Sequence, residues 1–380
     1  MAASGDGRTL VYSDSPQGTV GFVDISDPYD PKGMGTIDVG GEPTSVAVCD
    51  DYAIVVVNTS EDFVNVSGIW HVIKISEKKV LRTADLPGQP DSVAISPDCT
   101  TAAVAIENER DEDLGDGAPP QMPAGSVVVF DLSSADPAEW TTTEVDVTGL
   151  DGVAFPEDPE PEYISINSEG IAVVTLQENN ALVLIDTKKA EVVGSFTAGT
   201  VDLTGIDTVE DGIISQDSSL DAVPREPDGV AWIGTKYFAT ADEGDLDGGS
   251  RGFTIYDASG NVVFSSGNSM DRMTARLGHY PDERSENKGN EPENIAYGVY
   301  GKDELLFVNS ERSSLVFVYD VSHVSSPELV QILPAGTGPE GGLPIPHRDL
   351  LVVASEVDER DNKIRSVLNI YKKGKLSVSR

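Results

Sequence analysis

The segment from Pro161 to Phe196 carries the pattern of hydrophobic and polar positions that the rest of the chain repeats. Its four short apolar runs, rich in β-branched residues, span 163–167, 171–176, 181–185 and 192–196. Polar turn residues such as Ser168-Glu169-Gly170 separate the runs. Runs of this kind, bounded by such turns, are typical of antiparallel strands with tight connections. The segment therefore predicts one four-stranded antiparallel sheet.

Variants of this unit recur along the chain. One unit starts near Pro43 and the next near Pro90, and this spacing of 47 residues lies within the roughly 40 to 50 residues of a propeller blade. The predicted blades span 1–40, 41–87, 88–148, 160–198, 226–268, 291–335 and 338–380, with the fourth strand of the last blade at 375–378. One such sheet cannot bury both of its faces, whereas a ring of sheets can. We therefore predict a single domain over residues 1–380, an all-β, seven-bladed β-propeller of four-stranded antiparallel blades.

Four long insertions interrupt the repeats, at 107–125, 148–161, 197–227 and 267–292. Each falls between the second and third strands of a blade or between the fourth strand and the next blade. In a propeller these two connections open on the same face, which we call the elaborated face. Loops on a rigid scaffold commonly carry function, so we expect the functional site on this face.

The charge balance is strongly acidic, with 65 Asp and Glu residues against 26 Lys and Arg residues and a net charge of -39. Such a surface repels nucleic acid and anionic lipid and attracts cations. We therefore expect metal cations, and no nucleic acid, among the partners. The same acidity also fits a protein that stays soluble at high salt, and composition alone does not separate this reading from a calcium-binding role.

The two cysteines and the apolar runs bear on compartment and membrane association. Cys49 and Cys99 lie at or just past the ends of the first strands of neighbouring predicted blades. They either form one bridge or remain buried thiols, and the sequence leaves both open. No apolar run is long enough to span a membrane. Because Met1 runs almost directly into the first predicted blade, no signal peptide is expected.

Acidic and amide residues recur at two positions of the repeat. One series follows the second strands, as in Gln177-Glu178-Asn179-Asn180 and Asp242-Glu243-Gly244-Asp245, and the other precedes the first strands, as in Glu291-Pro292-Glu293. Together they would ring the channel mouth on the elaborated face with carboxylates. Carboxylate, amide and carbonyl oxygens are the ligands of hard cations such as calcium. The alternative is that these residues are ordinary turn formers whose charges are solvated.

Basic residues are scarce, so their clustering on the elaborated face is informative. Arg251 follows an Asp-rich loop, and Arg284 and Lys288 lie just before Glu291. They either pair with the neighbouring carboxylates or hold a phosphate or sulfate together with a bound metal.

Several segments occur in the order found in one known family. They are Val174–Ala181, Ala241–Asp245, Arg284–Glu293, Gly338–Gly341 and Ser355-Glu356-Val357. From Pro161 onward the chain resembles the choice-of-anchor I propeller family, which includes mesenchyme-specific cell-surface glycoproteins of biomineralising animals and domains of atypical bacterial alkaline phosphatases. The first three blades match only as generic propeller repeats.

The resemblance implies an extracellular or cell-surface protein linked to calcium-rich mineral deposition or to phosphate release. The metal ligands that it implies are Glu178, Asn179, Asp228, Glu243, Asp245, Glu291, Glu293 and Glu340. The candidate catalytic residues that it implies are Arg251, Arg284 and Lys288. The chain departs from the family pattern where Asp242 replaces the usual Asn and Asn294 the usual Gly, and neither a leader nor an anchor segment is visible.

Three functions are consistent with these observations. The first hypothesis is a non-enzymatic, calcium-binding surface module. The second is a calcium-dependent phosphatase, in which the metal polarises a phosphoryl group and the basic residues stabilise developing charge. The third is a propeller that docks protein or glycan partners without metal. The sequence does not predict the oligomeric state.

Overall fold

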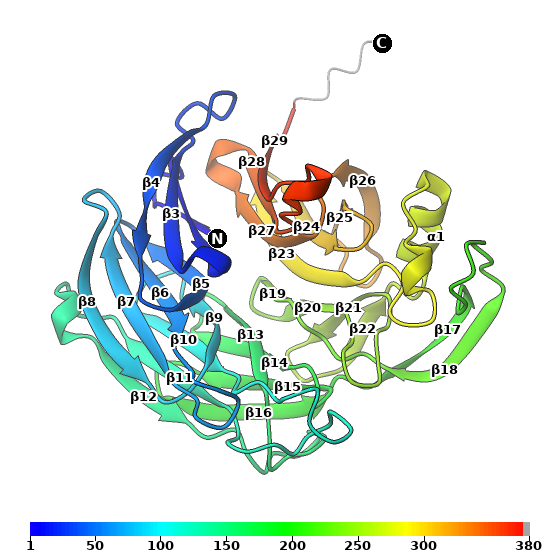
Figure 1. The fold of residues 1–380 in the computed structure, drawn as a ribbon, viewed down its shortest axis with the longest axis horizontal. Coiled ribbons are helices and arrows are strands. Elements are labelled where there is room, and N and C mark those ends of the chain that lie inside the picture. The colour runs from blue at the N-terminus through cyan, green and yellow to red at the C-terminus, as the bar shows by residue number, and fades with distance from the viewer. Residues whose placement is uncertain (375–380) are drawn as a thin grey trace.

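In the computed structural model, which describes residues 1–374, seven antiparallel sheets stand around a central axis (Figure 1). The first three are β1 (Ala2–Ala3), β2 (Thr9–Asp14), β3 (Thr19–Asp24) and β4 (Lys32–Asp38); β5 (Glu42–Cys49), β6 (Tyr52–Asn58), β7 (Gly68–Lys74) and β8 (Lys79–Leu86); and β9 (Pro90–Ile95), β10 (Thr101–Ile106), β11 (Ser126–Asp131) and β12 (Thr141–Val145). The next two are β13 (Pro161–Ile166), β14 (Ile171–Leu176), β15 (Ala181–Asp186) and β16 (Glu191–Thr197); and β19 (Val230–Ile233), β20 (Tyr237–Asp242), β21 (Gly252–Asp257) and β22 (Val262–Ser265). The last two are β23 (Pro292–Tyr300), β24 (Asp303–Ser310), β25 (Leu315–Asp320) and β26 (Glu328–Pro334); and β27 (Pro339–Ile345), β28 (Leu350–Ser355) and β29 (Val367–Lys372).

The predicted fold class, an all-β, seven-bladed β-propeller, is confirmed. Six sheets have four strands, and the seventh has three strands within the described residues. The fourth strand that we expected at 375–378 lies outside the described residues. Each sheet consists of strands that are consecutive in the sequence, so its hydrogen bonds are local along the chain.

The apolar positions that predicted the strands fill the spaces between neighbouring blades. Between the fourth and fifth blades, for example, the ring of Phe196 in β16 stacks on Phe238 in β20 at a centroid distance of 6.1 Å, and Leu182 of the fourth blade shares their buried cluster. The first strands of neighbouring blades contact one another and line the axis. Residues at the ends of these strands are therefore brought together at the channel mouth.

Two of the insertions contain regular secondary structure where the sequence predicted only loops. The insertion at 197–227 contains a separate two-stranded sheet, β17 (Thr200–Ile206) and β18 (Ser218–Pro224), and the insertion at 267–292 contains helix α1 (Ser269–Leu277). They lie side by side in Figure 1, and the amide of Asn268 donates to the carbonyl of Gly205 at 2.8 Å. Five short 3₁₀ helices complete the secondary structure of the described residues: Ser15–Gln17, Pro137–Glu139, Asp282–Arg284, Pro346–Arg348 and Arg360–Asn362.

The first and last blades meet by packing and side-chain hydrogen bonds. Leu10 and Ile25 of the first blade share a buried cluster with Leu350 of the seventh. The guanidinium of Arg348 donates to the carbonyl oxygens of Gly7 at 2.6 Å and Ile25 at 2.9 Å. Within residues 1–374, no strand of one of these blades pairs with the other.

Of the two alternatives for the cysteines, the structure shows the bridge. Cys49 at the end of β5 is disulfide-bonded to Cys99 in the turn between β9 and β10, so the bond joins the second and third blades. Among the described residues, no helix has the length and apolar character needed to cross a lipid bilayer.

Candidate metal centre

Three carboxylates from two neighbouring blades converge at the channel mouth. Asp228 lies just before β19, Glu243 just after β20, and Glu293 near the start of β23. One carboxylate oxygen from each lies within 4.8 Å of the other two. Asp228 is buried and the other two are half-buried. We call these three residues the axial carboxylate centre.

The loop that carries Glu243 is held in place by its backbone. Gly244 has a φ of 85°, and a Cβ at this position would lie 2.2 Å from the backbone nitrogen of Gly249. Only glycine therefore fits this turn without strain. The buried carboxylate of Glu226 accepts hydrogen bonds from the backbone N–H groups of Asp245 at 2.7 Å and Gly248 at 2.9 Å.

The axial carboxylate centre has a surplus of negative charge. Burial, together with neighbouring carboxylates, raises the pKa of Asp228 and of Glu293 well above the ordinary values. The three residues make one direct ion pair among the described residues, in which Lys288 Nζ donates to Glu243 Oε1 at 2.8 Å. When all three carboxylates are ionised, three negative charges face this one positive charge, which leaves two negative charges. A divalent cation would match this surplus, and an all-oxygen donor set suits calcium.

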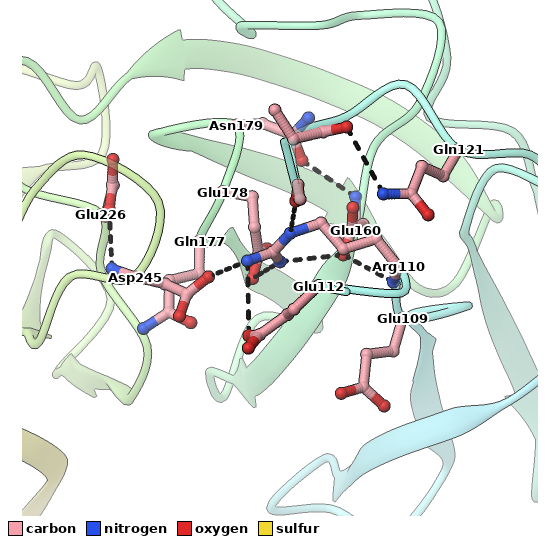
Figure 2. A network of polar contacts seen from close by, with 12 residues as sticks. Glu109, Arg110, Glu112, Gln121, Glu160, Gln177, Glu178, Asn179, Glu226 and Asp245 are labelled. Carbon is pink, nitrogen blue, oxygen red and sulfur yellow. Dashed lines mark hydrogen bonds and ion pairs between the residues drawn. The ribbon is translucent and has the colours of Figure 1, made fainter. Parts of the chain in front are cut away.

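Two of the expected ligands, Glu178 and Asp245, belong to a second group around Arg110 (Figure 2). Arg110 Nη1 donates to Glu178 Oε1 at 2.8 Å and lies 3.5 Å from Glu160 Oε2. Arg110 Nη2 bonds the carboxylate of Asp245. Arg110 was not predicted from the sequence, because it lies within a long insertion whose path across the mouth no pattern indicates.

The remaining expected ligands have other partners. Glu291 is fully buried and accepts from Arg284 Nε at 2.5 Å and Arg312 Nε at 2.6 Å. Burial and the nearby Glu356 carboxylate raise the pKa of Glu340 to about 8. Neither residue shares the close oxygen cluster of the axial carboxylate centre.

Asn179 has its whole amide engaged with the backbone. Its Nδ2 donates to the carbonyl oxygens of Ala154 at 2.8 Å and Asp158 at 2.9 Å, and its Oδ1 accepts from the N–H of Glu160 at 2.9 Å. The side chain therefore shapes the loop before β13 and does not face the mouth.

The three candidate catalytic residues also lie in different places, two at the channel mouth and one away from it. Arg284 and Lys288 border the mouth through their bonds to Glu291 and Glu243. Arg251 is 1% exposed, lies 3.2 Å from Asp271 Oδ2 in α1, and donates to the carbonyl of Ser285 at 2.7 Å. Arg251 thus anchors the α1 segment and does not face the mouth.

Solved structures share the fold of this chain at low sequence identity. Hydrazine synthase of Kuenenia stuttgartiensis aligns with a TM-score of 0.60 and 17% identity over 98% of this chain and 94% of that chain. The WD40 repeats of RRP9 align with a TM-score of 0.63 and 10% identity over 98% and 93% of the two chains. The Cps50 (Swd1) propeller domain of Myceliophteria thermophila aligns with a TM-score of 0.57 and 10% identity over 98% and 96%.

Sequence comparison gives the family. No curated protein matches the chain significantly. The family model of the choice-of-anchor I domain matches residues 2–248 and 246–324, which together span most of the chain, including the first three blades. The chain therefore belongs to the choice-of-anchor I domain family.

Proposed function

We propose that the protein is a surface module that binds a calcium ion at the axial carboxylate centre. The observation that supports this is the convergence of Asp228, Glu243 and Glu293, with one oxygen of each within 4.8 Å of the others. Calcium takes about six to eight oxygen ligands at about 2.3 to 2.6 Å, and bidentate carboxylates and water complete such a shell.

The raised pKa values of two of these carboxylates also favour the binding of a cation. Because burial raises the pKa of Asp228 and Glu293, these groups hold protons at a pH where exposed carboxylates are ionised. A divalent cation would replace these protons and satisfy the ionised oxygens, so calcium binding should release protons.

Two features support a location outside the cell. Choice-of-anchor domains are typically associated with the cell surface. The Cys49–Cys99 disulfide is the kind of bond that persists in oxidising compartments. A calcium-loaded acidic propeller at the cell surface would suit a role in calcium-rich mineral deposition.

Calorimetric titration with calcium tests the proposal directly. We expect the wild-type protein to bind about one ion at the axial carboxylate centre and to melt at a higher temperature when it is bound. Glu293→Gln should lose both effects, because it removes a ligand charge. Glu286→Gln removes the same charge from an exposed position on the neighbouring loop and should bind like the wild type. The absence of both binding heat and a melting shift in the wild type would refute the proposal.

A calcium-dependent phosphatase is the second candidate, favoured by the basic residues beside the centre. Arg284 bonds Glu291 through Nε, and its Nη groups make no hydrogen bond to the described residues. Bound calcium would supply a Lewis acid, while Arg284 and Lys288 would hold further oxygens of a phosphate ester. Turnover of para-nitrophenyl phosphate that ends on chelation and falls in Arg284→Met would support this activity. Inactivity across metals and pH would count against it.

A further inference from the structure

We infer that Glu160, Glu178 and Asp245 form a second divalent-cation site, which the guanidinium of Arg110 occupies in this chain. The identity of the expected ion rests on the proposed function, whereas the site itself rests on the contacts around Arg110. Two cation positions would then share one channel mouth, one available to metal and one filled by the protein.

The three carboxylates surround a single buried guanidinium (Figure 2). The side chain of Arg110 is 5% exposed, and those of Glu160 and Glu178 are 1% and 6% exposed. Asp245, which comes from the neighbouring blade, completes the group by accepting a hydrogen bond from Arg110 Nη2. The exposed Glu112 lies further out, with Oε1 at 3.6 Å from Arg110 Nη2.

One guanidinium does not supply a hydrogen-bond partner for every oxygen of these carboxylates. Glu160 Oε1 and Glu178 Oε2 are buried and have no hydrogen-bond partner among the described residues. Each of these two carboxylates thus offers one oxygen to Arg110 and leaves the other unpaired. Unpaired buried oxygens of this kind cost free energy. A divalent ion could bind both oxygens of a carboxylate and carry twice the charge.

Arg110 reaches this position on an insertion that crosses between blades. It lies in the connection between β10 and β11 of the third blade, whereas Glu178 follows β14 and Asp245 follows β20. Within its own loop Arg110 Nε donates to the carbonyl of Gly117 at 2.8 Å. The arginine is therefore a tethered counter-ion that joins three blades and excludes metal from the position it fills.

Calcium titration of Arg110→Gln tests the inference. We expect this variant to bind one ion more per chain than the wild type, measured by calorimetry and by metal content after dialysis. Arg110→Lys, which keeps the charge, should bind the wild-type number. Arg312→Gln removes a positive charge elsewhere at the mouth, beside Glu291 and Glu311, and should add no ion.

The double variant Arg110→Gln/Glu178→Gln locates the additional ion. It should lose that ion and return to the wild-type number, because Glu178 is a ligand of the second site only. An Arg110→Gln protein that keeps its far-ultraviolet circular dichroism and gains no ion would overturn the inference.

The two proposals fail separately. A wild-type protein without bound calcium, together with an Arg110→Gln protein that binds one ion, would reject the axial carboxylate centre and retain the second site. One bound ion in both proteins would retain the axial carboxylate centre and reject the second site. If Arg110→Gln does not fold, the number of bound ions per chain is measured in Arg110→Met and Arg110→Ala instead. Failure of every folded variant to gain an ion rejects the second site.

Discussion

Buried arginines on the elaborated face differ in what surrounds them. Arg251 donates mainly to backbone carbonyls, including those of Asp207 at 2.8 Å and Ser285 at 2.7 Å, and meets one carboxylate, Asp271. Arg110 is instead surrounded by carboxylates. The first arrangement fixes a loop, whereas the second neutralises carboxylates that would otherwise repel one another.

Arg251→Met should therefore reduce stability without affecting calcium binding. The substitution leaves the fully buried Asp271 without its ion pair, and loss of one partner of a buried pair costs about 3 to 5 kcal/mol. Urea denaturation measures the free energy of unfolding. Arg360→Met, at a side chain that is 71% exposed, is the control and should leave stability unchanged. A variant of full stability that no longer binds calcium would contradict this assignment.

At this scale the sequence predicted where the candidate residues lie but not which of them meet. Glu243 and Glu293 were predictable because strand ends on one face of a propeller converge on the axis. Asn179 follows the same pattern, yet its amide is bonded to backbone groups of the preceding loop. Such pairings depend on the path of an insertion, which has no periodicity to reveal it.

Among the elements, regular strands were more predictable than insertions. The alternation and β-branching of β14 and β15 correspond to a regular ladder from Ile171 to Leu176. The hairpin β17–β18 lacked this signal because few of its side chains are buried. Helix α1 did carry a signal, since Met270 and Thr274 are buried one turn apart and Gly278 ends the helix at a φ of 75°.

The disulfide is the covalent link between two neighbouring elements, the end of β5 and the turn after β9. Cys49 and Cys99 are separated by 50 residues, and closing a loop of that size stabilises a fold by about 4 kcal/mol in the chain-entropy account. We expect Cys49→Ser/Cys99→Ser to lose about 2 to 4 kcal/mol in chemical denaturation. Reducing agent should lower the stability of the wild type and leave that of the variant unchanged. Equal responses of the two proteins to reductant would contradict the prediction.

Across the whole molecule, the buried carboxylates around the mouth dominate the response to pH. Burial and neighbouring acidic groups raise the pKa of Asp91 to about 7 and that of Glu340 to about 8. Burial also raises the pKa of Glu311 to about 7, although Arg312 opposes the shift. The folded state therefore binds protons more tightly than the unfolded chain, whose carboxyl groups titrate near pH 4.

Stability in the presence of a chelator should accordingly fall as pH rises. The contribution of these groups is fully present below about pH 4 and is lost as the pH passes through about 7 to 8. Thermal unfolding between pH 5 and pH 8 should show a falling melting temperature in chelator and a flatter profile in calcium. A melting temperature that rises over this range in chelator would contradict the prediction.

The contiguity of the blades has a consequence for biosynthesis. Because every sheet is built from successive strands, each blade can complete its hydrogen bonds soon after its own segment leaves the ribosome. The bonds from Arg348 to Gly7 and Ile25 instead join residues more than 320 positions apart. Because synthesis proceeds from the N-terminus, the contact between the first and seventh blades would form last, and a nascent chain would expose the apolar flank of its first blade until then.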